Sequence, residues 1–260
     1  MTHSTAALVG ATGGAGTTRL AVEVGTTLAR DGREVAVLDA AFATEGLARH
    51  VSGRVEPDLT SVLTENRPLA DGLREHSATT DLAGRLELCP ARAPFERMAR
   101  AKTADAAQRF ETLLAEAGES FDHVLVDAPP VAANQVVAAV TAAERVAVVA
   151  PASERGVDAL QRTRGRVADV GASADAVVAN RASEDQPLRS ADAAVPESEA
   201  TGVENVPASV GDGNTDPESG FAPAVAHAAE VVFDAELELE FEESGLLEFD
   251  AEKYLPDALS

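Results

Sequence analysis

A glycine-rich segment near the start of the chain has the residue types and spacing of a loop that binds phosphate. It reads GATGGAGTT over 10–18, between an apolar run at 6–9 and a helical pattern at 19–29. A strand, a glycine-rich turn and a helix start, in this order, point backbone N–H groups and the positive end of the helix at an anion. The predicted phosphate-contacting residues are Gly13, Gly14, Ala15, Gly16, Thr17 and Thr18. The alternative is a glycine-rich turn that binds no ligand.

The loop lacks the lysine that completes such a site. In a working loop, a lysine after the last glycine reaches the β- and γ-phosphates, and the next hydroxyl holds Mg²⁺. Thr17 occupies the lysine position, whereas Thr18 still supplies the hydroxyl. Arg19 is expected to point away from the phosphates, because about 100° of rotation per helical residue places it roughly 200° around the helix from Thr17. The only two lysines, Lys102 and Lys253, are distant in sequence from the loop.

Apolar runs and helical patterns alternate through the first two-thirds of the chain. The apolar runs predict buried strands at 6–9, 35–38, 86–89, 123–126, 146–150 and 176–179. Helical patterns predict helices at 19–29, 59–63, 69–75, 104–117, 135–142 and 157–170. This alternation predicts an α/β fold in which a doubly wound, mostly parallel sheet is flanked by helices.

Polar residues directly follow three of the predicted strands. Asp39, Asp127 and Asn180 each lie one residue beyond an apolar run. Ligands in open α/β sheets bind at the carboxyl ends of the strands, so these side chains are candidates for a site there. Each of them has the alternative role of capping the helix that follows.

Charge is unevenly distributed along the chain, whose formal net charge is −23. Residues 186–260 contain 18 acidic and two basic residues, a net charge of −16, which leaves −7 for residues 1–185. This balance argues against direct binding to nucleic acid or to an anionic membrane. The many acidic residues, the excess of arginine over lysine and the small apolar side chains are typical of a protein from a high-salt cytoplasm.

The single cysteine and the N-terminal sequence exclude several classes of protein. Cys89 alone allows no intramolecular disulfide and no paired-cysteine metal site. The N-terminus has no basic segment followed by an apolar one, and no apolar run approaches the length of a membrane span. We therefore expect a soluble, cytoplasmic protein.

The composition changes near residue 183, which marks the end of the regular alternation. Residues 183–219 predict a long polar loop, partly disordered, that contains a short strand at 203–210. A closing helix is predicted after this loop, at 222–233. We expect a domain over 1–233 and an acidic appendage over 234–260. The appendage alternates acidic and apolar residues around a Ser-Gly pair, which is typical of a β-hairpin. A disordered acidic tail is the alternative.

The order of these landmarks resembles the MinD/ParA family, the deviant Walker A branch of the P-loop ATPases, over residues 5–233. The segment TGGAGTTR at 12–19 is similar to the family loop KGGxGKTT, and VAVLDAA at 35–41 to its strand ending in Asp-x-Asp. FDHVLVDAPP at 121–130 resembles the Walker B strand, and VANR at 178–181 the adenine-contacting segment. Three charged positions of the family are lost: its two loop lysines fall on Thr12 and Thr17, and its second aspartate on Ala41.

The resemblance implies specific roles for the residues that remain. Thr18, Asp39 and Asp127 would bind Mg²⁺, with Asp39 and Asp127 the catalytic carboxylates if the protein is active. Asn180 and Arg181 would frame the adenine. The implied cofactor is ATP or ADP with Mg²⁺, or none if the site is fully degenerate.

Two functional hypotheses follow from the resemblance and its departures. The first is a degenerate MinD/ParA-like member, of haloarchaeal origin, acting as a pseudo-ATPase regulator or scaffold in intracellular positioning or partitioning. The second is a slow Mg²⁺-dependent ATPase of this family in cell division or chromosome partitioning. We expect a protein partner, such as another MinD/ParA-family ATPase, and no direct contact with nucleic acid or membrane. Whether the chain forms a homodimer is left open.

Overall fold

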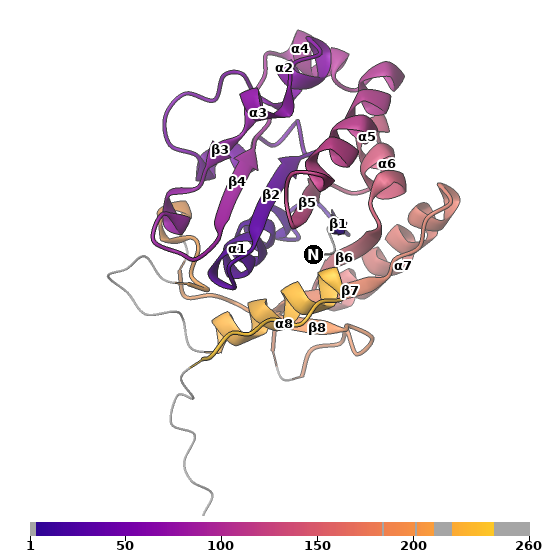
Figure 1. The fold of residues 1–260 in the computed structure, drawn as a ribbon. Helices are drawn as coiled ribbons and strands as arrows, with labels where there is room; N and C mark the ends of the chain where they lie inside the picture. Colours follow the sequence, from indigo (N-terminus) through magenta and orange to yellow (C-terminus); the bar gives the residue numbers. More distant parts are fainter. Residues whose placement is uncertain (1–3, 184, 201, 211–219, 242–260) are drawn as a thin grey trace, which may run out of the picture.

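An eight-stranded sheet forms the centre of the protein, in the order β3-β4-β2-β5-β1-β6-β7-β8 (Figure 1). The structure, a computed structural model, describes residues 4–183, 185–200, 202–210 and 220–241. Neighbouring strands are parallel throughout, except that β3 is antiparallel to β4. The strands are β1 (Ser4–Gly10), β2 (Glu34–Asp39), β3 (Arg74–Glu75), β4 (Arg85–Cys89), β5 (His123–Ala128), β6 (Arg145–Pro151), β7 (Ala176–Ala182) and β8 (Ala193–Pro196).

Helices connect the strands and cover both faces of the sheet. The α-helices are α1 (Thr17–Arg30), α2 (Leu59–Thr64), α3 (Leu69–Gly72), α4 (Phe95–Arg100), α5 (Ala104–Gly118), α6 (Asn134–Ala142), α7 (Glu154–Asp169) and α8 (Phe221–Phe233). Short 3₁₀ helices are η1 (Leu47–His50), η2 (Ser77–Thr79) and η3 (Val203–Asn205). The predicted α/β fold with a mostly parallel sheet between helices is therefore confirmed.

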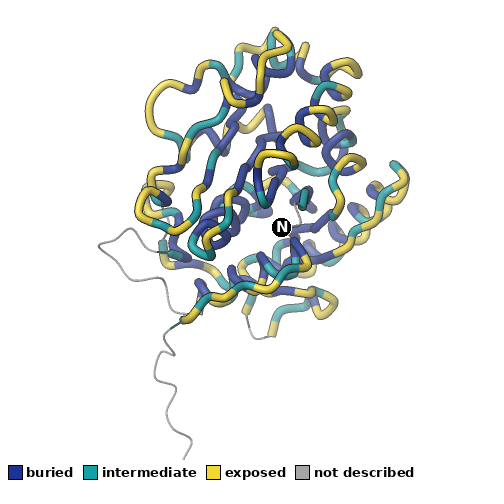
Figure 2. Tube along the Cα trace, viewed as in Figure 1, coloured by how far each residue is buried: buried dark blue, intermediate teal, exposed yellow. Residues whose placement is uncertain are grey.

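Alternate residues of each central strand pack into different layers of the core. On β1, Ala6 and Leu8 face the layer that contains α1 and α8, whereas Ala7 and Val9 face the layer that contains α5 and α6. Successive side chains of a strand point to opposite faces, so a parallel sheet buried on both sides requires continuous apolar runs. Figure 2 shows the central strands buried and the outer helix faces exposed.

The six predicted strands are all present, but one predicted helix is wrong in its second half. The pattern at 69–75 predicts a single helix, whereas α3 ends at Gly72 and β3 begins at Arg74. Gly72 is packed so closely that a Cβ atom there would lie 2.9 Å from both Cys89 Sγ and Val62 Cγ2. The chain then becomes extended at Leu73, with a ψ angle of 145°, and pairs with the edge of β4.

The predicted polar loop at 183–219 contains two elements that sequence patterning does not indicate. β8 adds to β7 as a further parallel strand, and Asp192 helps to place it by accepting a hydrogen bond from Val177 N at 2.8 Å. The short strand predicted at 203–210 is instead η3 followed by irregular chain. Pro207 lies in this stretch and has no N–H to donate to a strand ladder.

The described part of the acidic appendage lies against the end of α1. Leu237 packs on the apolar layer shared by α1 and α8, and the Arg30 guanidinium lies 5.1 Å from the centre of the Phe241 ring. Residues 235–241 pair with no strand of the described part of the chain. The rest of the predicted hairpin lies outside the described residues, so the hairpin stays a prediction.

Within the described ranges, no helix combines the length and the apolar composition that crossing a membrane requires.

Candidate functional site

The glycine-rich loop joins β1 to α1 and has the conformation that its glycines predict. α1 begins at Thr17, two residues earlier than the helical pattern indicates, and Gly16 is its N-cap with φ 86°. Gly14 also has a positive φ of 75°. A Cβ atom on Gly10 would lie 2.7 Å from Thr17 Oγ1, so the loop folds back tightly on its own first residue. Glycine is the residue that adopts such conformations without steric cost.

Neighbouring strands hold the loop in place through its backbone. Ala11 N donates to Val149 O of β6 at 2.8 Å, and Asn180 Nδ2 of β7 donates to Ala15 O at 2.8 Å. The loop packs so closely on Asn180 that a Cβ atom on Gly16 would overlap its side-chain amide. These contacts fix the first turn of α1 against the carboxyl ends of β6 and β7.

Two buried carboxylates lie beside each other at the same edge of the sheet. Asp39 ends β2 and is the register partner of Asp127 on the adjacent strand β5. Burial and the neighbouring charge of Asp127 raise the pKa of Asp39, although backbone N–H groups of Ala91 and Ala41 counteract the shift. Burial also raises the pKa of Asp127, and a hydrogen bond with the Thr18 side chain counteracts it. The structure therefore brings Thr18 together with Asp39 and Asp127, two of the three residues predicted at strand ends.

These three residues fit a Mg²⁺ ion that is also bound to phosphate. Asp127 Oδ2 is buried and has no hydrogen-bond partner, and two adjacent buried carboxylates create an excess of negative charge. Mg²⁺ sites of this kind use one or two protein carboxylates and complete the shell with phosphate oxygens and water. Over the described ranges, no three His, Cys, Asp or Glu side chains gather as a self-sufficient ligand set. Thr18, Asp39 and Asp127 would thus hold the ion together with a phosphate ligand.

The positions that lack a charge in the sequence are neutral parts of the same site. Thr17 and Ala41 are both buried, and Ala41 contributes only its backbone N–H, which donates to Asp39 Oδ1 at 2.8 Å. Gln135 contacts Ala40, the residue before Ala41, and sequence patterning does not indicate this contact. Its Nε2 donates to Ala40 O at 3.3 Å, and its buried Oε1 has no partner.

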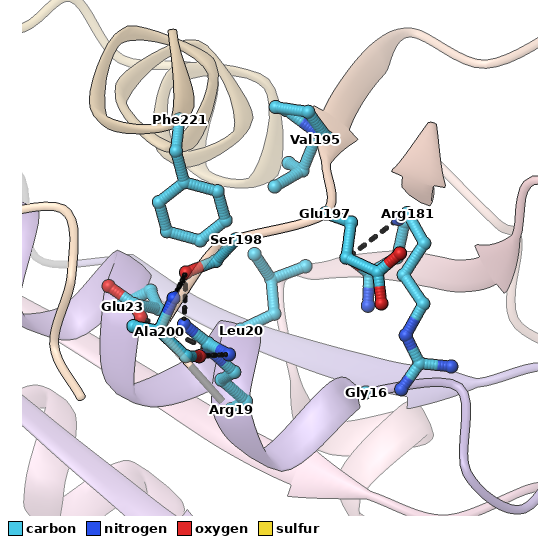
Figure 3. Close-up of a pocket in the computed structure, with 12 residues that line it drawn as sticks. Gly16, Arg19, Leu20, Glu23, Arg181, Val195, Glu197, Ser198, Ala200 and Phe221 are labelled. Atoms are coloured by element: carbon cyan, nitrogen blue, oxygen red, sulfur yellow. Dashed lines mark hydrogen bonds and ion pairs between the residues drawn. The ribbon is translucent and has the colours of Figure 1, made fainter. Parts of the chain in front are cut away.

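Arg19 is directed away from the phosphate-facing side of the loop, as the helical rotation predicts. Its guanidinium is held by Ser198 Oγ at 2.7 Å, by the carbonyl of Ala200 and by Glu23 at 3.3 Å (Figure 3). These partners lie in the segment after β8 and on α1. Arg19 therefore ties that segment to the helix.

A cavity of about 220 Å³ opens on the outer side of the loop, between the start of α1 and the ends of β7 and β8. Its apolar wall is formed by Leu20, Val195 and Phe221, and Gly16 borders it (Figure 3). Polar groups on its other sides come from Arg19, Glu23, Asn180, Arg181, Glu197 and Ser198. An apolar wall with a few polar groups next to a phosphate loop has the chemistry that a nucleoside requires.

Asn180 and Arg181, the residues predicted to frame the adenine, both border this cavity and both contact the loop. Both polar atoms of the Asn180 amide form hydrogen bonds. Its Nδ2 donates to Ala15 O, and its Oδ1 accepts from Arg181 N at 3.0 Å. Arg181 Nη1 lies 3.5 Å from Gly14 O. The sequence did not indicate that Val195, Phe221 and Glu23 belong to this site, since only the fold brings them into the lining of the cavity.

Comparisons with known proteins agree with this geometry. Residues 4–174 match the model of the AAA domain family AAA_31. No curated protein sequence matches the chain significantly. A ParA family ATPase from Chlorobium tepidum has a similar structure, with 17% identity, a TM-score of 0.71 and coverage of 87% of this chain and 98% of that one.

Two MinD structures are also similar. MinD from Pyrococcus horikoshii, complexed with Mg-ADP, has 18% identity and a TM-score of 0.70, with 87% of this chain and 94% of that one covered. The MinC:MinD complex from Aquifex aeolicus matches with 19% identity and a TM-score of 0.67, covering 92% of this chain and 98% of that one. The family match spans more than half of the chain, and the protein therefore belongs to the AAA domain family, with the fold of the MinD and ParA ATPases.

Proposed function

We propose that the protein is a MinD/ParA-like pseudo-ATPase that binds ATP or ADP with Mg²⁺ and acts as a regulator or scaffold in intracellular positioning or partitioning. The proposal rests on one observation: the site keeps its metal-binding residues but lacks charged side chains at two other positions. Thr18, Asp39 and Asp127 converge beside a formed loop, whereas Thr17 and Ala41 supply no charge there. The first group suffices for Mg²⁺-dependent binding, whereas tight binding and rapid hydrolysis require charges at the positions of Thr17 and Ala41.

The chemistry of the residues that are kept and of those that are lost explains why we expect nucleotide binding without hydrolysis. Mg²⁺, when bound, neutralises phosphate charge. The backbone of Gly13–Gly16 and the N-terminus of α1 orient the phosphates, and Thr18 with the two aspartates holds the metal. Hydrolysis in addition needs a group that positions the attacking water. Ala41 has no side-chain acceptor for that purpose.

Binding of labelled ATP at molar KCl, followed by a turnover assay, tests the proposal. We expect saturable, Mg²⁺-dependent binding that Asp127→Ala weakens, and no phosphate release above the level of the Asp127→Ala protein. Wild-type turnover that Asp127→Ala abolishes would contradict the pseudo-enzyme. Absence of any binding would reduce the chain to a scaffold without a nucleotide.

A slow Mg²⁺-dependent ATPase in cell division or chromosome partitioning is the second candidate, and Gln135 favours it. Its Oε1 is buried and has no partner among the described residues, and its Nε2 binds the carbonyl of Ala40, the residue before Ala41. Glutamine positions the attacking water in other phosphoryl-transfer enzymes. If Gln135 has this role, Gln135→Leu will abolish the slow turnover while ATP affinity is retained. A scaffold predicts no turnover in either protein.

The partner and the habitat are further parts of the proposal. The Aquifex aeolicus MinD is found in complex with MinC, which supports a protein partner for this chain as well. Another MinD/ParA-family ATPase is the partner that a degenerate site favours, and analytical ultracentrifugation of the chain alone tests homodimerisation. The net charge of −23 supports a high-salt cytoplasm, as in haloarchaea, and opposes nucleic acid or membrane as direct ligands. A folded domain over 1–233 and an acidic appendage over 234–260 remain part of the same proposal.

A further inference from the structure

Arg181 has an irregular backbone that turns it out of the register of β7. The pairing of β7 with β8 shifts between Asn180 and Ala182, so that Arg181 is the extra residue of a bulge. Its φ angle is +56°, a left-handed conformation that is strained for a residue with a Cβ atom. Bulges of this kind re-aim a side chain and are frequent beside functional sites. The bulge therefore gives the Arg181 side chain a direction that regular strand geometry would not.

The Arg181 side chain extends to the glycine-rich loop. Arg181 Nη1 donates to Gly14 O at 3.5 Å, and Figure 3 shows the guanidinium extending from β7 toward the loop beside Gly16. Of the hydrogen bonds among the described residues, this is the one that joins a basic side chain to the backbone of the loop at 10–16. Arg181 is also exposed, so its charge is available to a ligand at the rim of the loop.

The loop needs a positive charge that its own residues do not provide. Thr12 and Thr17 are neutral, and Arg19 is held by Ser198, Ala200 and Glu23. The two buried carboxylates on the other side of the site add negative charge. A triphosphate placed there without a nearby cation would be repelled, even with one Mg²⁺ bound.

We propose that Arg181 is the phosphate-binding cation of this site, delivered from β7 to the loop in place of a loop lysine. The inference rests on the proposed nucleotide binding. It assigns Arg181 to the phosphates rather than to the base, because its contact is with a loop carbonyl. The planar guanidinium suits this role, since it donates several hydrogen bonds to phosphate oxygens at once.

Calorimetric titration of ATP, and of adenosine as a competitor, tests the assignment on the full chain. Arg181→Ala should weaken ATP binding about tenfold, as removal of a charged hydrogen-bond donor does, and change adenosine binding by less than about twofold. Arg181→Lys should recover most of the ATP affinity, because it keeps the charge. The decline of log affinity with log salt should be shallower in Arg181→Ala than in the wild-type protein.

Arg189→Ala is the matched control, because Arg189 is exposed, lies in the β7–β8 connection and changes the net charge equally. It should leave ATP affinity unchanged. Equal losses of ATP and adenosine binding in Arg181→Ala would place the side chain on the base and overturn the inference. Unchanged ATP affinity in Arg181→Ala would also overturn it and leave the proposed function standing. A wild-type protein that binds no ATP would overturn both.

Discussion

Asp39 and Asp127 occupy directly opposite positions on the neighbouring strands β2 and β5, and both are buried. Each carboxylate raises the cost of ionising the other, and burial removes the water that would screen them. Asp39 compensates in part by accepting two backbone N–H groups, whereas Asp127 keeps one oxygen without a partner. The pair is therefore poised to hold a proton or a cation, and its protonation must affect the stability of the fold.

Stability of the protein without nucleotide should fall as the pH rises from about 4 to about 8, because of this pair. The pKa of Asp39 is raised from 3.8 to about 8, so the folded protein holds a proton that the unfolded chain has already lost. The resulting stabilisation is complete at low pH and disappears as the pH passes the folded-state pKa. Urea denaturation at pH 5 and pH 8.5 measures the difference, which should be on the order of a few kcal/mol.

Asp127→Asn should flatten this pH dependence and stabilise the protein at the alkaline end. The asparagine removes the charge that opposes ionisation of Asp39, and its oxygen still accepts from Thr18. Asp158→Asn, on the exposed face of α7, is the control for a change in net charge and should leave the profile as in the wild type. Identical profiles for Asp127→Asn and the wild type would show that the pair does not govern the titration.

Substitution of the loop glycines should separate strain from steric conflict. Gly16→Ala combines a φ of 86° with a Cβ that overlaps Asn180, so we expect a loss of about 2 kcal/mol or more in stability and loss of ATP binding. Gly14→Ala meets no neighbour and should cost only the strain of its positive φ. Gly13→Ala meets no neighbour and has no positive φ, which makes it the matched control. An equal effect of all three would contradict the loop conformation.

Thr17→Lys should raise ATP affinity, because residue 17 is the first residue of α1 and lies where the loop meets the phosphates. Restoring one partner of a buried charge pair is worth on the order of 2–5 kcal/mol, or about 30-fold or more in affinity. Thr17→Met has a similar length without the charge and should give no gain. If Thr17→Lys binds ATP no better than Thr17→Met in calorimetry, the backbone cradle is not formed as described.

Hydrolysis should require Ala41→Asp in addition to Thr17→Lys. Affinity alone does not position water, so the single variants should release phosphate no faster than the wild type. The double variant should show measurable turnover, and the effects should be strongly non-additive, as for residues that act as one unit. Adding Thr12→Lys should matter only if the chain forms a homodimer, since the family resemblance implies that a lysine at position 12 reaches the partner's nucleotide. Turnover in Ala41→Asp alone would contradict this order.

Glu23→Gln should loosen the wall of the cavity. The Glu23 carboxylate is fully buried and accepts from Ala208 N at 3.1 Å and from Ser209 N at 2.9 Å. An amide nitrogen cannot accept from either donor, so we expect a loss of about 1–3 kcal/mol in urea denaturation. Amide exchange at residues 208 and 209 should accelerate. Glu111→Gln, on the exposed face of α5, should change neither quantity.

Apolar patterning was sufficient to predict the central strands and the placement of Asp39 and Asp127 at strand ends, whereas the grouping of Thr18 with them was implied by the family resemblance. Continuous apolar runs leave few alternatives to a buried parallel strand, and the parallel order then places all strand ends at one edge of the sheet. β3 and β8 could not be predicted in this way. β3 contains only two residues, and β8 is an Ala-Ala-Val-Pro segment whose pairing depends on the neighbouring β7.

The contacts that complete the candidate site were beyond prediction from one sequence. The hydrogen bond from Arg181 to Gly14 depends on a bulge in β7, and no local pattern encodes that bulge. The attachment of Glu23 to residues 208 and 209 joins positions 185 and 186 residues apart. Helical patterning marks Glu23 only as a polar residue of α1, and its burial follows from packing by a segment rich in small polar residues.

The burial of Glu23 imposes an order on folding during synthesis. α1 leaves the ribosome well before the backbone donors that satisfy its buried carboxylate, because these are 185 and 186 residues further along the chain, at residues 208 and 209. Until they emerge, α1 presents a charge on the face that will enter the core, and such a charge opposes burial. The nascent chain therefore completes the α1 side of its core only after residues 208 and 209 have been translated, and α8 follows closely to cover it.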